Sequence, residues 1–211
     1  RQSVRRVFAL REILAKEDGI REVARKLLAD MRANGGGDFA TEYALPFAFA
    51  ISTRLIGLPG SKNDIAWLVD HLTRSMQRTV GENGVPQDAS QSNIEAEDYI
   101  HQIVERRLNE LAAGSDPNVS DVITQVSAAM EKGKVDSDEM VGLTHLVYSA
   151  STDAPSALLT NCVAVLDKYP QLQVFLRENS SMIPNFIEEV LRYDTPGQNV
   201  SRQTTVDLTF S

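Results

Sequence analysis

The sequence predicts a mainly α-helical fold with a long central helix and a short β segment at its C-terminal end. Apolar residues recur at steps of three and four through most of the 211 residues, and glycine, proline and capping residues separate these runs. Strict alternation appears near the end, at Val206, Leu208 and Phe210, as in a half-buried strand. We expect one incomplete domain over residues 1–211, because no second terminal strand is visible to pair with this one.

The composition and net charge of the chain argue against two classes of partner, nucleic acids and membranes. With 42% hydrophobic residues the chain is long enough to bury a core. Its 29 acidic and 21 basic residues give a net charge of −8, which argues against a nucleic-acid-binding surface. The longest apolar stretch, residues 43–51, is far shorter than the roughly 20 residues of a membrane span. We therefore expect neither nucleic acid nor a membrane among its partners.

Metal and redox chemistry based on cysteine or histidine clusters is also disfavoured. Cys162 is the only cysteine, so a disulfide within the chain and a CxxC site are excluded. The three histidines, His71, His101 and His145, lie far apart and lack the spacing of metal ligands. We expect no metal site formed by this chain.

The first part of the chain predicts a series of helices. Residues 1–34 carry apolar residues at helical spacing with one break, which predicts two helices, and the glycines at 35–37 end the second. Residues 43–56 predict the next helix, which Gly57 ends. Ser61 is a suitable N-cap for the helix that follows.

The middle of the chain contains one expected loop and two further helices. Residues 81–91 are rich in polar residues, glycine and proline, and predict a loop. Ser92 and Glu95 have the spacing of a capping box, which predicts the start of a helix that ends near Gly114. Another helix is expected over residues 119–132.

The long central helix begins at a second capping box, Asp136 with Glu139, and extends to about Lys168. Two shorter helices are expected over residues 171–179 and 184–193.

The centre of this long helix contains small and polar residues where a core helix would carry apolar ones. Pro155 has no amide hydrogen to donate to the carbonyl of Ser151, so we expect the helix to bend or open there. The opening would make room for a ligand, and Asp153 beside it is suited to donate or relay a proton. A surface aspartate next to a proline kink explains the same residues, and the spacing does not decide between the two.

Glu189 and Arg192 lie three residues apart on one expected helix face and are close enough to pair. By itself this spacing is weak evidence, because it also occurs at Glu22 and Arg25. The continuation to Arg202 in a strand-like stretch adds weight.

Five segments together resemble the cytochrome P450 monooxygenases, in particular the soluble bacterial type. They are similar to that family's H-x-x-x-R-R helix, L-(L/I)-G-(V/L)-P turn, oxygen-binding segment (A/G)-G-x-(D/E)-T, E-x-x-R helix and the strand whose arginine meets a haem propionate. In chain order they are residues 1–8 (RQSVRRVF), 54–59 (RLIGLP), 150–153 (ASTD), 187–196 (IEEVLRYDTP) and 200–202 (VSR). The resemblance covers nearly the whole chain and implies a cytochrome P450-like fold, the helical part of a haem monooxygenase and a cytoplasmic location.

The resemblance implies roles for residues at the haem. Arg5 and Arg202 would pair with the haem propionates, a contact that suits a guanidinium group. Arg1 stands where the family commonly has histidine or tryptophan, so that contact would be altered or absent. Ala150 would lie on the haem side of the central helix. Glu189 and Arg192 would form a buried structural pair on the opposite, proximal side.

It also implies a catalytic segment with two departures from the family pattern. Asp153 would belong to the proton path. Ala154 stands at the usual threonine position, so a substrate hydroxyl or an ordered water replaces the missing hydroxyl, or oxygen activation is poor. Ser151 replaces the usual second glycine, and its side chain either narrows the groove or supplies a substitute hydroxyl.

The substrate implied by the resemblance is a small organic molecule, and the electrons would come from a separate redox protein such as a ferredoxin. The residues expected to face the substrate are Leu146, Ser149, Gln198 and Val200.

The cysteine that holds the family's haem iron lies in an F-x-x-G-x-x-x-C-x-G loop, which the 211 residues do not contain. Cys162 follows Asp153 by nine residues, which places it on roughly the opposite helix face. We expect haem in the full-length protein, and no haem-thiolate centre in these residues alone.

Two hypotheses follow. In the first, the chain is part of a monooxygenase that inserts one oxygen atom into its substrate. In the second, it is a haem-free helical scaffold that acts as a binding or assembly module. Either way, missing parts of the fold would expose apolar surface, and we expect either association into dimers or helices rearranged to cover the gap.

Overall fold

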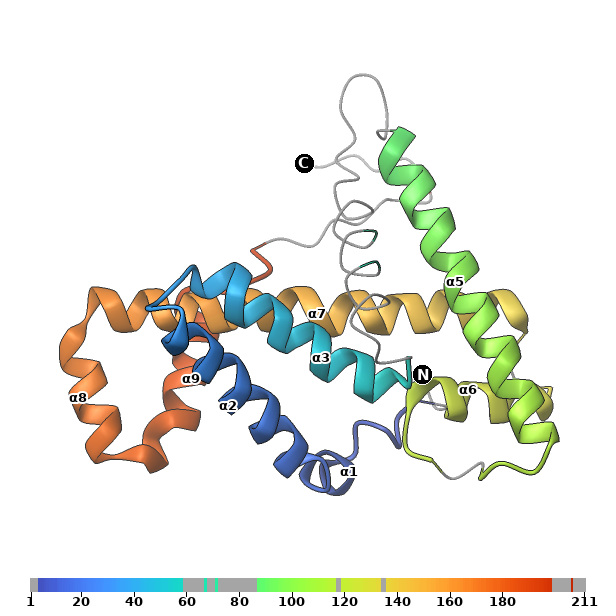
Figure 1. Cartoon of the computed structure of the whole chain (residues 1–211), viewed down its shortest axis with the longest axis horizontal. Helices are drawn as coiled ribbons and strands as arrows, with labels where there is room; N and C mark the ends of the chain where they lie inside the picture. Colours follow the sequence, from blue (N-terminus) through green and yellow to red (C-terminus); the bar gives the residue numbers. More distant parts are fainter. Residues whose placement is uncertain are drawn as a thin grey trace. The chain divides into compact units, whose positions relative to one another are not determined.

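The structure is a computed structural model that describes residues 4–58, 67, 71, 87–116, 119–133, 136–198 and 206. It divides into two compact units, Arg1–Ser156 and Ala157–Ser211, and each is considered by itself. The prediction of one domain therefore stays a prediction. The regular elements of the described residues are helices, which confirms the mainly α-helical fold (Figure 1). The strand expected around Leu208 lies, apart from Val206, outside the described residues.

The N-terminal part contains the two helices expected in residues 1–34, although the first is short. The elements are α1 (Leu10–Leu14), α2 (Glu17–Ala33), the π-helical turn η1 (Ala40–Ala44) and α3 (Leu45–Ile56). Gly57 ends α3 in the left-handed conformation, with φ of 85°, as its sequence position predicts.

Helix α5 (Gln87–Ala112) begins earlier than the sequence predicts. Residues 87–91 are helical, so that part of the expected loop is wrong, and so is the capping box at Ser92. Ser92 is buried inside the helix, and the carboxylate of Glu95 is 2.7 Å from Nε2 of His71 instead of capping the backbone. No glycine or proline interrupts residues 87–112, so nothing in the local sequence stops the helix from extending.

The second capping box is confirmed at the start of α7 (Ser137–Lys168), after α6 (Val122–Glu131). The amide of Glu139 donates to Oδ1 of Asp136 at 2.8 Å, and the amide of Asp136 donates to Oε2 of Glu139 at 3.2 Å. The two side chains thus satisfy amides that lack a partner at a helix start.

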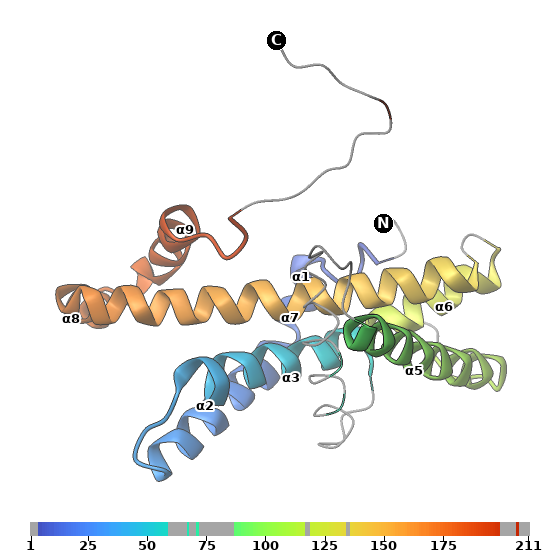
Figure 2. The ribbon, with the colours of Figure 1, turned by 90° about the horizontal axis from the view of Figure 1, so that it is seen from above.

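The core of the first unit lies where α3, α5, α6 and the first part of α7 pack together. In both Figure 1 and Figure 2, α3 lies alongside α7. Tyr148 of α7 is fully buried, and its ring centroid is 5.9 Å from that of Phe49 of α3. Apolar side chains from each of these helices share the core: Phe49, Ile56, Ile100, Val104, Ile123, Val126 and Met140.

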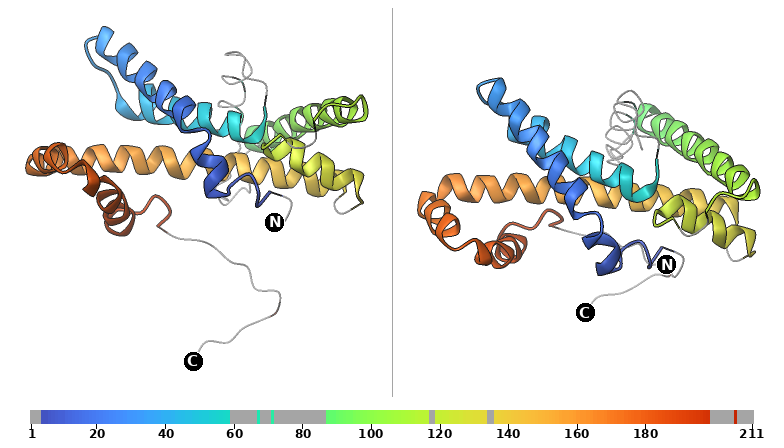
Figure 3. Two further views of the ribbon diagram at one scale, coloured as in Figure 1. Left: turned by 90° about the horizontal axis from the view of Figure 1, so that it is seen from below. Right: turned by 60° about the horizontal axis from the view of Figure 1, so that its bottom comes forward.

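The second unit consists of the end of α7, α8 (Pro170–Glu178), the short 3-10 helix η2 (Ser180–Met182) and α9 (Ile183–Tyr193). The two shorter helices predicted from the sequence are thereby confirmed. Nδ2 of Asn161 donates to the carbonyl of Asp194 at 2.8 Å, which joins α7 to the end of α9. Nε2 of Gln173 donates to the carbonyl of Leu166 at 2.9 Å, which joins α8 to the end of α7. Figure 3 shows α8 leaving the end of α7 in a new direction.

Candidate functional site

The segment of α7 around Pro155 is the centre of the predicted site. The helix was expected to bend or open there. It does not open, because helical structure continues without a break from Ser137 to Lys168, and the bend stays a prediction. Pro155 still cannot donate to the carbonyl of Ser151. The hydroxyl of Ser52 on α3 donates to this carbonyl instead, with an Oγ to O distance of 2.7 Å.

One face of this segment is exposed and carries four of the predicted site residues. Leu146 is 65% exposed, and Ala150, Asp153 and Ala154 are exposed as well. At 100° per residue, these four positions fall within about a quarter to a third of a turn. The opposite face is buried in the core of the first unit through Thr144, Tyr148, Thr152 and Ser156. The structure therefore brings these four predicted residues together on one surface.

The hydroxyl groups of the segment are directed at the helix backbone. Ser151 Oγ and Thr152 Oγ1 both donate to the carbonyl of Tyr148, at 3.1 and 3.0 Å. Ser156 Oγ donates to the carbonyl of Asp153 at 2.8 Å. Ser151 therefore uses its hydroxyl proton within the helix and presents its oxygen lone pairs as acceptors.

The remaining predicted residues are only partly placed. Arg5 lies exposed in the turn that precedes α1. Gln198 is exposed in the second unit. Arg1, Val200 and Arg202 lie outside the described residues, so their predicted roles stay predictions.

Glu189 and Arg192 form the predicted pair on α9. Nε and Nη2 of Arg192 donate to the two carboxylate oxygens at 2.8 and 2.6 Å, a bidentate geometry. The pair was expected to be buried, but the side chains are 60% and 70% exposed, respectively. Spacing along a helix predicts pairing, whereas burial depends on what packs over the pair. The hydrogen bonds from Arg192 hold the pKa of Glu189 below its usual value.

This pair gives a prediction for acid stability. The pKa of Glu189 is lower in the folded chain than in the unfolded chain. Ionised Glu189 therefore stabilises the fold at pH values above the pKa of an unfolded glutamate. This contribution is lost as the pH falls through the lowered pKa of the folded chain. Glu189→Gln should thus reduce the free energy of unfolding slightly at neutral pH and leave it unchanged in acid, as measured by urea unfolding. Glu188→Gln serves as the control, and an equal effect at both pH values would contradict the prediction.

Cys162 does not fit the role of a thiolate ligand for haem iron. Cys162 is half-buried, and burial raises the pKa of its thiol, which opposes the thiolate form that binds iron. Among the residues that the structure describes, no group of three or more histidine, cysteine or acidic side chains is placed to hold a metal ion. The exposed face of α7, with two alanines among its four residues, would fit one side of a flat cofactor.

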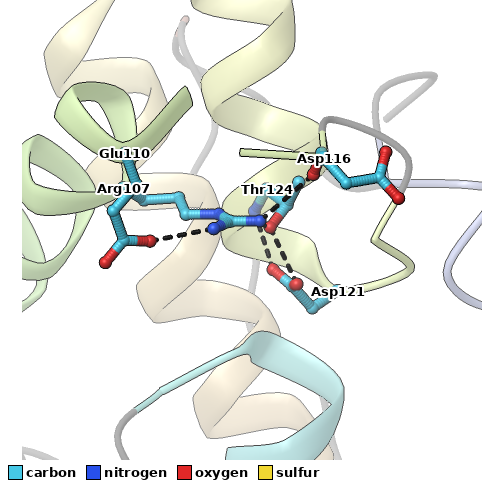
Figure 4. Close-up of polar contacts among 5 residues, drawn as sticks. All are labelled: Arg107, Glu110, Asp116, Asp121 and Thr124. Atoms are coloured by element: carbon cyan, nitrogen blue, oxygen red, sulfur yellow. Dashed lines mark hydrogen bonds and ion pairs between the residues drawn. The ribbon is translucent and has the colours of Figure 1, made fainter. Parts of the chain in front are cut away.

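A polar cluster between α5 and α6 was not found from the sequence. Nε of Arg107 donates to Oγ1 of Thr124 at 2.9 Å, and Thr124 donates through its amide and hydroxyl to Asp121 at 2.7 and 2.8 Å (Figure 4). Arg107 also contacts Glu110 at 2.8 Å and the carbonyl of Asp116 at 3.3 Å. Asp121 is the N-cap of α6, a role its position before the apolar residues 122 and 123 could have indicated.

Two of the pockets among the described residues contain none of the predicted site residues. One, of about 450 Å³, is bordered by Gly57, Arg107 and Asp121 in the first unit. The other, of about 590 Å³, is lined mainly by apolar residues of the second unit, including Leu166 and Phe186. Neither is lined by a residue predicted for the site, so neither replaces the α7 face as the candidate.

Comparison with known sequences gives a consistent set of relatives, although no family model matches the chain. Cytochrome P450 107B1 of Saccharopolyspora erythraea is 23% identical over 208 residues, which cover 98% of this chain and 48% of the relative. The vitamin D(3) 25-hydroxylase of Pseudonocardia autotrophica is 26% identical over 215 residues, covering 100% of this chain and 50% of the relative. The chain thus spans about half the length of these curated relatives.

Solved structures give the same result for the fold. CalO2 superposes with a TM-score of 0.79 at 23% identity, over 92% of this chain and 47% of that one. The cytochrome P450 PksS of Bacillus subtilis superposes with a TM-score of 0.78 at 24% identity, with the same coverage. P450BioI, solved in complex with an acyl carrier protein, superposes with a TM-score of 0.75 at 22% identity, over 92% of this chain and 50% of that one.

No helix in the part of the chain that the structure describes is long and apolar enough to cross a membrane. Similarity along the whole sequence and the helical fold both point to the same group of proteins, the cytochromes P450. The 211 residues are similar along their whole length to cytochromes P450, share the helical fold of the solved P450 structures, and span about half of the length of these relatives.

Proposed function

We propose that these residues form the helical part of a haem-thiolate monooxygenase that inserts one oxygen atom into a small organic substrate. The observation that supports this best is the exposed face of α7, where Leu146, Ala150, Asp153 and Ala154 share one surface. Small side chains at the centre of that face leave room for a flat cofactor. The similarity to cytochromes P450 along the whole chain supports the same assignment.

On this proposal each residue of the α7 face has a distinct task. Asp153 is the group that exchanges protons with solvent, since its carboxyl is exposed beside the cofactor face. Ala154 has no hydroxyl to pass a proton on, so a substrate hydroxyl or an ordered water takes that part. Leu146 and Ser149 border the substrate. When bound, the haem supplies the iron that activates dioxygen.

Other parts of the site come from residues that the α7 face does not contain. Arg5 and Arg202 are proposed to hold the haem propionates, and Gln198 with Val200 to border the substrate. The iron ligand is proposed to come from residues beyond these 211. Electrons are proposed to arrive from a separate redox protein such as a ferredoxin, and the location to be cytoplasmic.

The absorption spectrum after reduction under carbon monoxide tests the proposal. A thiolate-bound haem gives a distinctive band, which we expect from the full-length protein reconstituted with haem. We expect no such band from the 211 residues alone, because their one cysteine is half-buried with its thiol pKa raised. Cys162→Ser should leave both results unchanged.

Two outcomes would contradict the proposal. Absence of the band from the full-length protein would favour the haem-free scaffold. A band from the 211 residues that disappears in Cys162→Ser would show that the ligand was assigned wrongly. Sedimentation of the 211 residues tests the expected dimer separately, and a monodisperse monomer would count against it.

A further inference from the structure

Ser52 of α3 makes a hydrogen bond that a serine inside a helix does not ordinarily make. Helical serine hydroxyls usually donate to a carbonyl three or four residues earlier in their own helix. The hydroxyl of Ser52 instead reaches α7, where it donates to the carbonyl of Ser151 at 2.7 Å. The Ser52 side chain is only 1% exposed, so this bond forms away from solvent.

The acceptor of this bond is the one carbonyl that the sequence leaves without a helical partner at this point. In a regular helix the carbonyl of residue 151 accepts from the amide of residue 155, and Pro155 has none. A polar group removed from water without a partner destabilises its surroundings. The Ser52 hydroxyl provides a donor to this carbonyl, and helix α7 continues through Pro155.

We propose that Ser52 is a positioning residue whose hydroxyl substitutes for the missing amide of position 155 and holds residues 150–154 in helical geometry. The structural part of this inference stands on the Ser52 to Ser151 contact alone. The functional part rests on the proposed function: by fixing this turn, Ser52 determines where Asp153 stands relative to the cofactor face.

A double-mutant cycle on the 211-residue chain tests the substitution directly. Pro155→Ala restores an amide at position 155, so the carbonyl of Ser151 then has a helical donor and no longer depends on Ser52. We expect Ser52→Ala to speed amide hydrogen exchange in residues 151–157 about tenfold. In the Pro155→Ala background the same substitution should change exchange less than twofold.

Ser127→Ala is the matched control, because Ser127 is equally buried and its hydroxyl has no hydrogen-bond partner among the described residues. It removes the same atom without removing a bond to a carbonyl. We expect it to leave exchange in residues 151–157 unchanged. If Ser52→Ala does not fold, recovery of a folded chain in the Ser52→Ala, Pro155→Ala double variant gives the same evidence.

Three results would overturn the inference: unchanged exchange in Ser52→Ala, an equal increase in the Pro155→Ala background, or an equal increase in Ser127→Ala. If Ser52→Ala does not fold and the Ser52→Ala, Pro155→Ala double variant does not fold either, the inference is overturned as well. These measurements need no haem. A missing carbon monoxide band would therefore reject the proposed function without affecting the exchange result, and an absent coupling to Pro155 would reject this inference alone.

Discussion

Replacement of Asp153 by asparagine in the full-length protein is expected to lower the rate of product formation by about 100-fold or more. Asparagine has nearly the same shape but cannot take up and release a proton at neutral pH. Asp153 is exposed on α7 and makes no hydrogen bond through its carboxylate among the contacts of the described residues. The fold should therefore tolerate the change, and the loss should fall on the chemical step.

The measurement is the rate of product formation at saturating substrate and reductant, together with urea unfolding to show an unchanged fold. Asp153→Glu keeps a proton-bearing group and should recover part of the rate. Asp167→Asn removes another exposed carboxylate of α7 and serves as the control. A rate for Asp153→Asn within about twofold of the wild type would exclude Asp153 from the proton path.

Substitution of Gly57 by alanine is expected to reduce the free energy of unfolding by about 2 to 4 kcal/mol. Gly57 has φ of 85°, a conformation that costs a residue with a side chain about 1 to 2 kcal/mol. An added Cβ would also come within 2.5 Å of Oδ1 of Asp121. That oxygen accepts from the amide of Thr124 at 2.7 Å, so moving it breaks the N-cap of α6.

Gly133→Ala separates the cost of the left-handed backbone conformation from the cost of the close approach to Asp121. Gly133 has φ of 64°, and nothing lies within 4 Å of the position of an added Cβ. Its replacement should cost only the conformational part, about 1 to 2 kcal/mol. Urea unfolding of both variants measures the difference. Equal losses would show that the approach to Asp121 contributes nothing.

Helix ends could be predicted from sequence where the interaction that forms them is local. Asp136 and Glu139 cap each other across three residues, and Gly57 ends α3 through its own backbone conformation. Ser92 and Glu95 have the same spacing as the first pair and gave a wrong prediction. Glu95 is bonded to His71, 24 residues earlier, a contact that no local pattern contains.

The candidate site likewise has features that follow from the local sequence and features that depend on contacts between distant segments. The common face of Leu146, Ala150 and Asp153 follows from helical periodicity alone, and so does the pairing of Glu189 with Arg192. The exposure of that pair does not follow from periodicity, because solvent access depends on which other segments pack nearby. The cluster of Arg107 and Thr124 was missed for the same reason, since its members come from two helices.

The sequence by itself determined that the carbonyl of Ser151 loses its helical donor, because proline lacks an amide hydrogen wherever it stands. It could not determine whether the helix opens as a result. That outcome was decided by the packing of α3 against α7, which brings the hydroxyl of Ser52 to this carbonyl across 99 residues of chain. A hydrogen bond depends on distance and direction in space, and for residues so far apart in sequence only the folded chain sets either one.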